Sequence, residues 1–236
     1  MLQQNMSVVL PGDLVNTDDV AVGKKRPLIG PGLVQMDSDT VCSCKAGLIK
    51  RKPNMVWVDS RQKRYVAMKG DSVIGIVTAR QADSFRVDIG TSDPASLSYL
   101  SFEGATKKNR PDVKVGDVIF GKLLVANKNM DPELVCIDSF GKANGMGAMK
   151  DGGTLVHLNL HWTRRLLSPE CSLLKLIGDQ LPYETAMGLN GRIWIKGRSP
   201  VETLAISRLL QNGEGVAPSA MNNYVTKTIN KVVGVK

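Results

Sequence analysis

Long apolar runs are missing from this chain of 236 residues. A helix that spans a bilayer needs about 18 or more consecutive apolar residues, and no stretch approaches that length. The opening MLQQNMSVVLPGDLV also lacks the basic start and apolar core of a secretory signal peptide. We therefore expect a soluble protein that is not secreted and has no membrane partner.

Cysteine is scarce as well, and its four copies are scattered along the chain: Cys42, Cys44, Cys136 and Cys171. A chain of this length does not depend on disulfide bonds to hold a core, so the pattern favours free thiols in a reducing compartment. Small disulfide-stabilised secreted domains are therefore disfavoured.

Histidine occurs only twice, and no tight cluster of carboxylates accompanies it. A zinc site would have to combine Cys42-x-Cys44 with His157 and His161, but structural zinc prefers two to four residues between its cysteines. We interpret both histidines as part of one strand, in which four residues span about 13 Å. General acid–base pairs and two-metal sites are likewise not recognisable. The sequence predicts no metal, no cofactor and no catalytic residue.

Positive charge, in contrast, is in excess, with 31 Lys and Arg against 22 Asp and Glu and a formal net charge of +9. This surplus favours a polyanion partner, nucleic acid before anionic membrane. With 42% hydrophobic and 22% charged residues and no biased tract, the chain has the composition of a globular protein.

The pattern of turn residues and apolar residues changes twice along the sequence, which divides the chain into three parts. Residues 1–68 are rich in turns and in short strand-like runs, among them SVVLPGDLV, TVCSCKAGLIKRK, MVWVDS and RYVAM. We expect a small β domain over 1–68, a β-barrel over 69–153 and an α+β domain with a C-terminal tail over 154–236. The predicted fold class is mainly β with an α+β C-terminal part.

The middle part contains five strand-like runs. In SFRVDIG, Phe85, Val87 and Ile89 alternate with polar residues, which is the period of a strand. The other runs are DSVIGIVTA, ASLSYL, DVIFGKLLVA and ELVCIDS, and one long polar link, EGATKKNRPDVKVG, separates the third run from the fourth. Five short strands with one long link are typical of the OB-fold, a barrel that binds single-stranded nucleic acid.

The last part predicts the β-α-α-β-β-α order of a KH domain. LVHLNL, YETAMGL and GRIWIKG indicate strands, and WTRRLLSPECSLLKLIGDQL indicates two helices broken at Ser168 and Pro169. A final helix is predicted after Ser199, because Ser199 and Glu202 match a capping box. Its apolar stripe is expected to be Leu204, Ile206, Leu209 and Leu210.

The stretch GLNG at 188–191 has the G-x-x-G pattern with which KH domains clamp a nucleic-acid backbone. Such a clamp lies between the first two helices, near helix N-termini, but here that loop is SPE. GLNG lies instead between two predicted strands, where Asn190-Gly191 is typical of a tight hairpin with positive φ at both residues. We interpret Gly188, Asn190 and Gly191 as a structural turn.

Four longer runs resemble, in one order, the family of RNA exosome cap subunits called ribosomal RNA-processing protein 40: WVDSRQKRYVAMKGDSVIGIV, DPASLSYLSFEGATKKNRP, VGDVIFGKLLVANKNMDPELVCIDSFGKANGMG and GLNGRIWIKG. The resemblance covers about residues 8 to 211, and the tail after Asn212 matches least. It implies an N-terminal β domain, an S1-type OB-fold and a KH domain in which G-x-N-G is structural. It also implies a non-catalytic subunit that sits on a ring of RNase PH-like proteins and helps to thread RNA into a central channel.

Cationic side chains of the barrel are the candidates for RNA contact. Lys107, Lys108 and Arg110 come first, because three cations within four residues of the long link can neutralise phosphates. The alternative is a charged loop that is merely solvated. Secondary candidates, on loops or strand edges, are Arg80, Lys122 and Lys128.

Two aromatic residues, Phe85 and Tyr99, are candidates for stacking on bases, since aromatic rings accept any base. Phe85 alternates in step with Val87 and Ile89, and Tyr99 is in step with Leu97. This periodicity favours a place in the barrel core for both rings.

Together, these features predict a non-enzymatic RNA-binding cap subunit of the RNA exosome. It would stabilise the ring and guide RNA to the 3'-5' exonuclease in ribosomal RNA processing and RNA degradation. The expected partners are single-stranded RNA and RNase PH-like ring subunits in a hetero-oligomer, and the expected location is the nucleus and nucleolus, with a cytoplasmic pool. The alternative is a stand-alone RNA-processing enzyme or a translation-factor-like OB protein.

Overall fold

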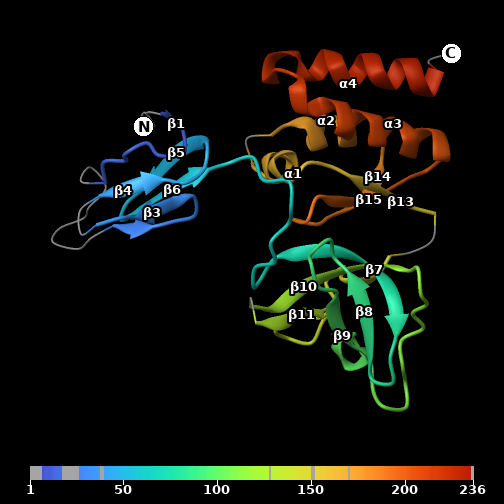
Figure 1. Cartoon of the computed structure of the whole chain (residues 1–236). Coiled ribbons are helices and arrows are strands. Elements are labelled where there is room, and N and C mark those ends of the chain that lie inside the picture. Colours follow the sequence, from blue (N-terminus) through green and yellow to red (C-terminus); the bar gives the residue numbers. More distant parts are fainter. Residues whose placement is uncertain are drawn as a thin grey trace. The chain divides into compact units, whose positions relative to one another are not determined.

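The structure is a computed structural model that describes residues 7–17, 27–37, 40–127, 129–149, 152–169 and 171–234. The chain divides into two compact units, Met1–Gln62 and Lys63–Lys236 (Figure 1). The first unit is built of strands, and the second begins with a sheet of strands and gathers its α-helices towards the C-terminus, which confirms the predicted fold class. Across these ranges, no helix is long and apolar enough to cross a bilayer.

The first unit is a small β structure. One sheet has the order β1-β5-β6-β2 and a second sheet pairs β3 with β4; the strands are β1 (Val8–Val9), β2 (Leu28–Ile29), β3 (Leu33–Gln35), β4 (Val41–Ser43), β5 (Gly47–Lys52) and β6 (Met55–Asp59). Inward side chains of these strands meet in one apolar core that includes Ile49, Val56 and Val58. The β5–β6 hairpin turns at Asn54, whose φ of 63° is a left-handed conformation that asparagine tolerates.

The second unit begins with five strands that close into a barrel, in the order that the sequence predicts. They are β7 (Ser72–Arg80), β8 (Ser84–Asp88), β9 (Ala95–Ser98), β10 (Val118–Asn127) and β11 (Met130–Val135). β7 pairs with β8 and β10, β8 pairs with β9, and β11 joins β9 in parallel and β10 in antiparallel orientation. A short strand, β12 (Gly147–Ala148), also pairs with β10.

The segment 64–68, predicted as strand-like, is irregular, so that detail of the prediction is wrong. Tyr65 is buried in the barrel core and Ala67 packs against it. The Tyr65 hydroxyl donates a hydrogen bond to Asp71 Oδ2 at 2.7 Å. The segment therefore packs Tyr65 and Ala67 against a barrel that five other strands already close, and it does not form a further strand.

The remaining chain has the β-α-α-β-β-α order of a KH fold: β13 (Thr154–His157), α1 (Leu160–Leu166), α2 (Leu173–Gln180), β14 (Tyr183–Met187), β15 (Arg192–Gly197) and α3 (Pro200–Asn212). The three strands form one sheet in the order β13-β15-β14. The predicted cap is present, because Ser199 Oγ accepts a hydrogen bond from the Glu202 N–H at 3.2 Å.

Two details predicted for this region are wrong. The first strand ends at His157, and Asn159 is the N-cap residue of α1, so His161 lies on a helix and not on a strand. Leu204 is 49% exposed, whereas Ile206, Leu209 and Leu210 are buried as predicted. The buried face of α3 is completed by Thr203, Ala205 and Ser207, which were not predicted from the sequence.

The chain beyond α3 is helical and belongs to the same core. The short turns η3 (Gly213–Gly215) and η4 (Pro218–Ala220) lead to α4 (Met221–Ile229), which continues into η5 (Asn230–Gly234). Met221, Val225 and Ile229, four residues apart, share one helix face and are buried in the core that α2 and α3 also line. Figure 1 shows α4 as the outermost helix of this stack.

Candidate nucleic-acid interface

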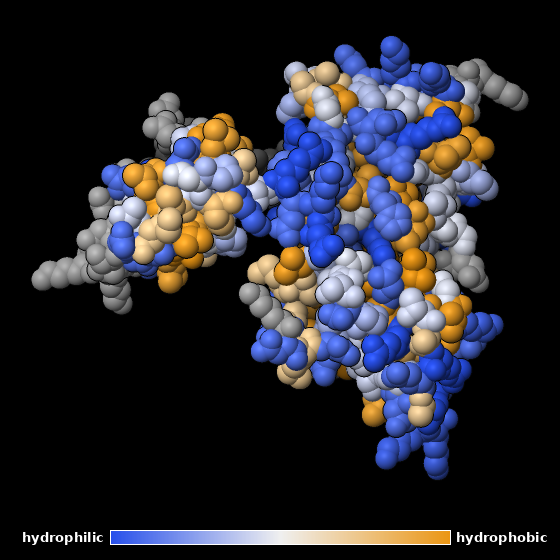
Figure 2. Space-filling model, viewed as in Figure 1, coloured by the Kyte–Doolittle hydropathy of each residue, from blue (hydrophilic) through white to orange (hydrophobic). Residues whose placement is uncertain are grey.

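The link between β9 and β10 carries the three cations that the sequence favours. A turn at 106–109 holds its tip: the Thr106 N–H donates to the Asn109 carbonyl oxygen at 2.9 Å, and the Asn109 N–H donates to Thr106 Oγ1 at 3.0 Å. Lys107 and Lys108 occupy the two central positions of this turn and are exposed. The link projects at the bottom of the barrel in Figure 1, and the same place is hydrophilic in Figure 2. Both ammonium groups are therefore accessible to an anion.

Arg110 leaves this turn and returns to the barrel. Its Nη1 donates to the Ala82 carbonyl oxygen at 3.0 Å, and its Nη2 lies 3.9 Å from Asp83 Oδ1. Its Cζ also lies 4.6 Å from the centre of the Tyr99 ring, within the range of a cation–π contact. Since Ala82 and Asp83 lie between β7 and β8, Arg110 ties the link to the β7–β8 hairpin.

The secondary candidates do not lie in one place. Arg80 is exposed at the end of β7 and borders the same small hollow as Arg110. Lys122 pairs with Ser72, at the opposite end of β7. Ser72 and Arg80 are eight positions apart, which corresponds to about 26 Å of strand, so Lys122 is remote from the Lys107–Arg110 segment. Lys128 lies outside the described residues.

The two aromatic candidates lie in the core, as their periodicity predicts. Phe85 is 3% exposed, and its ring meets that of Phe102 edge to face, with 6.3 Å between the centroids. Tyr99 is 7% exposed, and the Arg110 guanidinium lies over its ring. Neither ring therefore offers an open face on which a base could stack.

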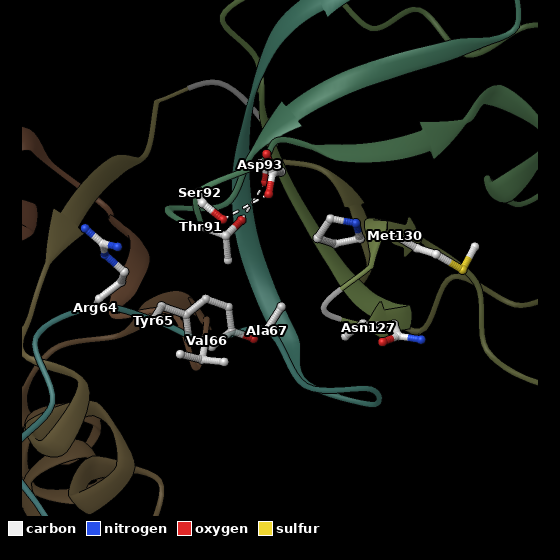
Figure 3. A pocket seen from close by; sticks show the side chains of 11 residues that line it. Arg64, Tyr65, Val66, Ala67, Thr91, Ser92, Asp93, Asn127 and Met130 are labelled. Carbon is white, nitrogen blue, oxygen red and sulfur yellow. Dashed lines mark hydrogen bonds between the residues drawn. The ribbon is translucent and has the colours of Figure 1, made fainter. Parts of the chain in front are cut away.

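A cavity of about 600 Å³ lies between the 64–67 segment, the 91–93 loop and the β10–β11 hairpin (Figure 3). Its walls mix apolar side chains, such as Val66 and Met130, with Arg64 and with the hydroxyl groups of the 91–93 loop. The two hydroxyl groups of this loop donate to Asp93, at 2.7 Å to its carbonyl oxygen and at 3.0 Å to its carboxylate. A cation and a carboxylate line the same cavity, so its charge does not favour an RNA backbone.

The GLNG turn connects the KH sheet to the barrel. The Gly188 N–H donates to the Arg192 carbonyl oxygen at 2.9 Å, and the Gly191 N–H donates to the Gly188 carbonyl oxygen at 3.1 Å. This is a three-residue loop in which only Gly191 has positive φ, at +80°; Asn190 does not, so the predicted positive φ at Asn190 is wrong. A Cβ on Gly188 would lie 2.7 Å from the Ile74 nitrogen, so glycine permits the close approach of β7.

Asn190 contributes through its side chain. Its Nδ2 donates to the carbonyl oxygens of Ile74 and Ile89, at 2.7 and 2.8 Å, and its Oδ1 accepts from the Ile74 N–H at 3.2 Å. The pairing of β7 with β8 stops at Ile76 and Asp88. The Asn190 amide therefore takes the place of a strand partner for main-chain groups just beyond that point, which would otherwise be buried without one.

Arg192 makes a second connection, which no pattern in the sequence predicted. Its Nη1 and Nη2 donate to the carbonyl oxygen and to Oδ2 of Asp88, at 2.5 and 2.6 Å. Burial by itself would raise the pKa of Asp88. The hydrogen bonds from Arg192 and the Gly90 N–H, together with the positive charge of Arg192, instead hold this pKa below its ordinary value. The two residues are 104 positions apart, so their pairing leaves no local signal.

A pH titration of stability tests this ion pair. Because the folded-state pKa of Asp88 is depressed, the pair stabilises the fold above the unfolded-state pKa of about 3.9. This contribution is lost as the pH falls through the folded-state pKa. Between about pH 5 and pH 2, we expect Asp88→Asn to lose less stability than the wild type in urea unfolding. Identical pH profiles would show that Asp88 titrates as it does in the unfolded chain.

The residues considered for zinc have other surroundings. Cys42 Sγ lies 3.4 Å from the Gly12 carbonyl oxygen, and all four cysteines are free thiols, as predicted. Burial raises the pKa of Cys136 to about 12, which keeps that thiol protonated at neutral pH. Over the parts of the chain that the structure describes, no three His, Cys, Asp or Glu side chains are grouped so that they could hold a metal ion.

The arrangement defines a class of protein: an S1-type barrel fastened to a KH fold, with a small β unit before them. Family models match each part. The model described as "Mammalian exosome complex component RRP40, N-terminal" matches residues 7–61, "Exosome complex component RRP40, S1 domain" matches 65–147, and "KH domain" matches 153–201.

Curated relatives agree with these models. Exosome complex component RRP40 of Homo sapiens is 49% identical over 198 residues, which cover 81% of this chain and 72% of the relative. Its counterpart in Drosophila melanogaster is 44% identical over 229 residues, 97% of this chain and 94% of the relative. A solved structure of a candidate exosome complex RNA-binding protein shares the fold, with a TM-score of 0.58 and 22% identity over 71% of this chain and 97% of that chain. The chain belongs to the exosome complex component RRP40 family.

Proposed function

We propose that this protein is an RNA-binding cap subunit of the RNA exosome that carries out no chemistry itself. In this role it stabilises the ring and guides single-stranded RNA to a 3'-5' exonuclease during ribosomal RNA processing and RNA degradation. The observation that carries the proposal is the exposed Lys107–Lys108 tip on an S1-type barrel, in a chain whose relatives are named exosome complex components.

The same proposal includes partners and location. RNase PH-like ring subunits are the protein partners that family membership suggests, in a hetero-oligomeric complex. The nucleus and nucleolus, with a cytoplasmic pool, are the compartments where such a complex would meet its RNA. Support for an assembled state also comes from the surface of the first unit, where Leu14, Val34 and Met36 are 72%, 47% and 68% exposed.

RNA binding by the full chain tests the proposal. Removing one phosphate interaction should lower the slope of log K against log salt by about 0.7 for a single strand. For Lys107→Ala/Lys108→Ala we therefore expect a slope smaller by about 1.4 and, from the same effect, an affinity roughly 25-fold lower at about 0.1 M salt. Fluorescence anisotropy with a labelled single-stranded RNA measures both quantities.

A matched control removes the same charge elsewhere. Lys227→Ala/Lys231→Ala takes two exposed lysines from the C-terminal helices and should leave the affinity nearly unchanged. Equal losses in the two double variants would mean that net charge, and not the Lys107–Lys108 tip, determines binding. Incubation with magnesium separates the alternative, because shortened RNA would indicate a stand-alone RNA-processing enzyme.

A further inference from the structure

The three cations of the 106–110 segment are not equivalent. Among the described residues, neither Lys107 nor Lys108 has an ion pair or a side-chain hydrogen bond, and both are exposed. Arg110 has a hydrogen bond to Ala82, an ion-pair contact with Asp83 and a cation–π contact with Tyr99. The two lysines are available to a phosphate, whereas the arginine is already engaged within the protein.

The engagement of Arg110 depends on its chemistry as an arginine. One planar guanidinium reaches a carbonyl oxygen and a carboxylate with different nitrogens while its face lies over a ring. A lysine ammonium is a single compact charge that cannot span those three groups at once. A change from arginine to lysine therefore keeps the charge at this position and removes the connection.

The connection acts on the 106–109 turn, whose other hydrogen bonds, among the described residues, lie within the link. The turn is closed by the Thr106–Asn109 hydrogen bonds and by a bond of 3.4 Å from Asn109 Nδ2 to the Gly104 carbonyl oxygen, all within the link. Arg110 is the next residue, and its partners Ala82 and Asp83 lie on the β7–β8 hairpin. Arg110 thus joins the turn to the β7–β8 hairpin, and this lowers the conformational entropy that the two lysines lose when RNA binds.

We propose that Arg110 is a positioning residue, which holds the Lys107–Lys108 tip against the β7–β8 hairpin beside Arg80, and that the two lysines make the phosphate contacts. This inference rests on the proposed RNA-binding function. It changes the role expected for Arg110, which the sequence alone places among the contact residues.

Conservative substitutions separate the two roles. Lys107→Arg/Lys108→Arg keeps both charges at the tip, and its affinity for a labelled single-stranded RNA should stay within about twofold of the wild type. Arg110→Lys should weaken binding about fivefold, close to the effect of Arg110→Ala, because preorganisation is removed in both. Arg86→Lys is the matched control, because Arg86 also pairs weakly with an aspartate, Asp131, at 3.8 Å. The side chains of the two arginines are similarly exposed, 42% for Arg86 and 46% for Arg110.

Non-additivity gives a second readout. If Arg110 acts through the lysines, adding Arg110→Ala to Lys107→Ala/Lys108→Ala should weaken binding little further, whereas an independent phosphate contact would add its own effect. Amide hydrogen exchange should also be faster at Thr106 and Asn109 in Arg110→Lys than in the wild type.

The possible outcomes distinguish the positioning role of Arg110 from the proposed RNA-binding function on which it rests. Wild-type affinity in Arg110→Lys, or additive effects in the triple variant, would overturn the positioning role while leaving the lysine contacts in place. Unchanged affinity in Lys107→Ala/Lys108→Ala would instead remove the proposed RNA site itself.

Discussion

Replacing Asn190 by alanine is expected to lower the free energy of unfolding of the Lys63–Lys236 unit by about 3 kcal/mol, because three hydrogen bonds to main-chain groups are removed together. Ile74 is fully buried, so its N–H and carbonyl oxygen would be left without the amide that satisfies them. Urea unfolding of the full chain, followed by far-UV circular dichroism, measures the change.

Two further variants define the cause. Asn190→Asp keeps the size of the side chain but removes both donors and places a carboxylate beside the carbonyl oxygens of Ile74 and Ile89, so it should be at least as unstable as the alanine variant. Asn223→Ala, on the exposed side of α4, should change stability by no more than about 0.5 kcal/mol. A decrease below about 1 kcal/mol in Asn190→Ala would contradict the role given to this amide.

The second large effect is expected in the C-terminal helix. Val225 is fully buried in α4, at the centre of the face that packs on the KH core. Val225→Asp would bury a carboxylate among apolar side chains and should destabilise the fold by about 4 kcal/mol or more. Thermal or urea unfolding of the full chain would show the effect as a lower midpoint.

The control for Val225→Asp is Asn222→Asp, which adds a carboxylate to an exposed position of the same helix. Its stability should remain close to that of the wild type. If both variants unfold at the wild-type midpoint, α4 contributes nothing to the KH core, and the residues after Asn212 are dispensable for folding.

Periodicity was sufficient to predict the elements that bury one face. Phe85, Val87 and Ile89 alternate inward because a strand places successive side chains on opposite faces, and all three are in the barrel core. The cap at Ser199 was equally predictable, because its signal is contained within four residues. Local patterns of this kind determine the order of strands and helices, and they identified the Lys107–Lys108 tip as the accessible charge.

Contacts between distant segments were not predictable. Asn190 bonds Ile74 across 116 positions and Arg192 bonds Asp88 across 104, so neither pair leaves a periodic trace in the sequence. The hydrogen bond from Arg110 to Ala82 was not predictable for a similar reason, because it depends on how the long link folds back onto the β7–β8 hairpin. At Leu204 the local pattern misled, because the buried face of α3 includes its neighbours Thr203 and Ala205 and leaves Leu204 49% exposed.

In the ring formed by β7, β8, β9, β11 and β10, each strand is paired on both sides. These five strands therefore leave little unpaired backbone to which another chain could add a strand. Sequence changes are therefore tolerated best in the connections at the two ends of the barrel, because insertions and charge changes there do not disturb the hydrogen bonds between strands. Over evolutionary time, a lineage can alter the residues of the β9–β10 link, and with them the charge at this end of the barrel, while the barrel itself is kept.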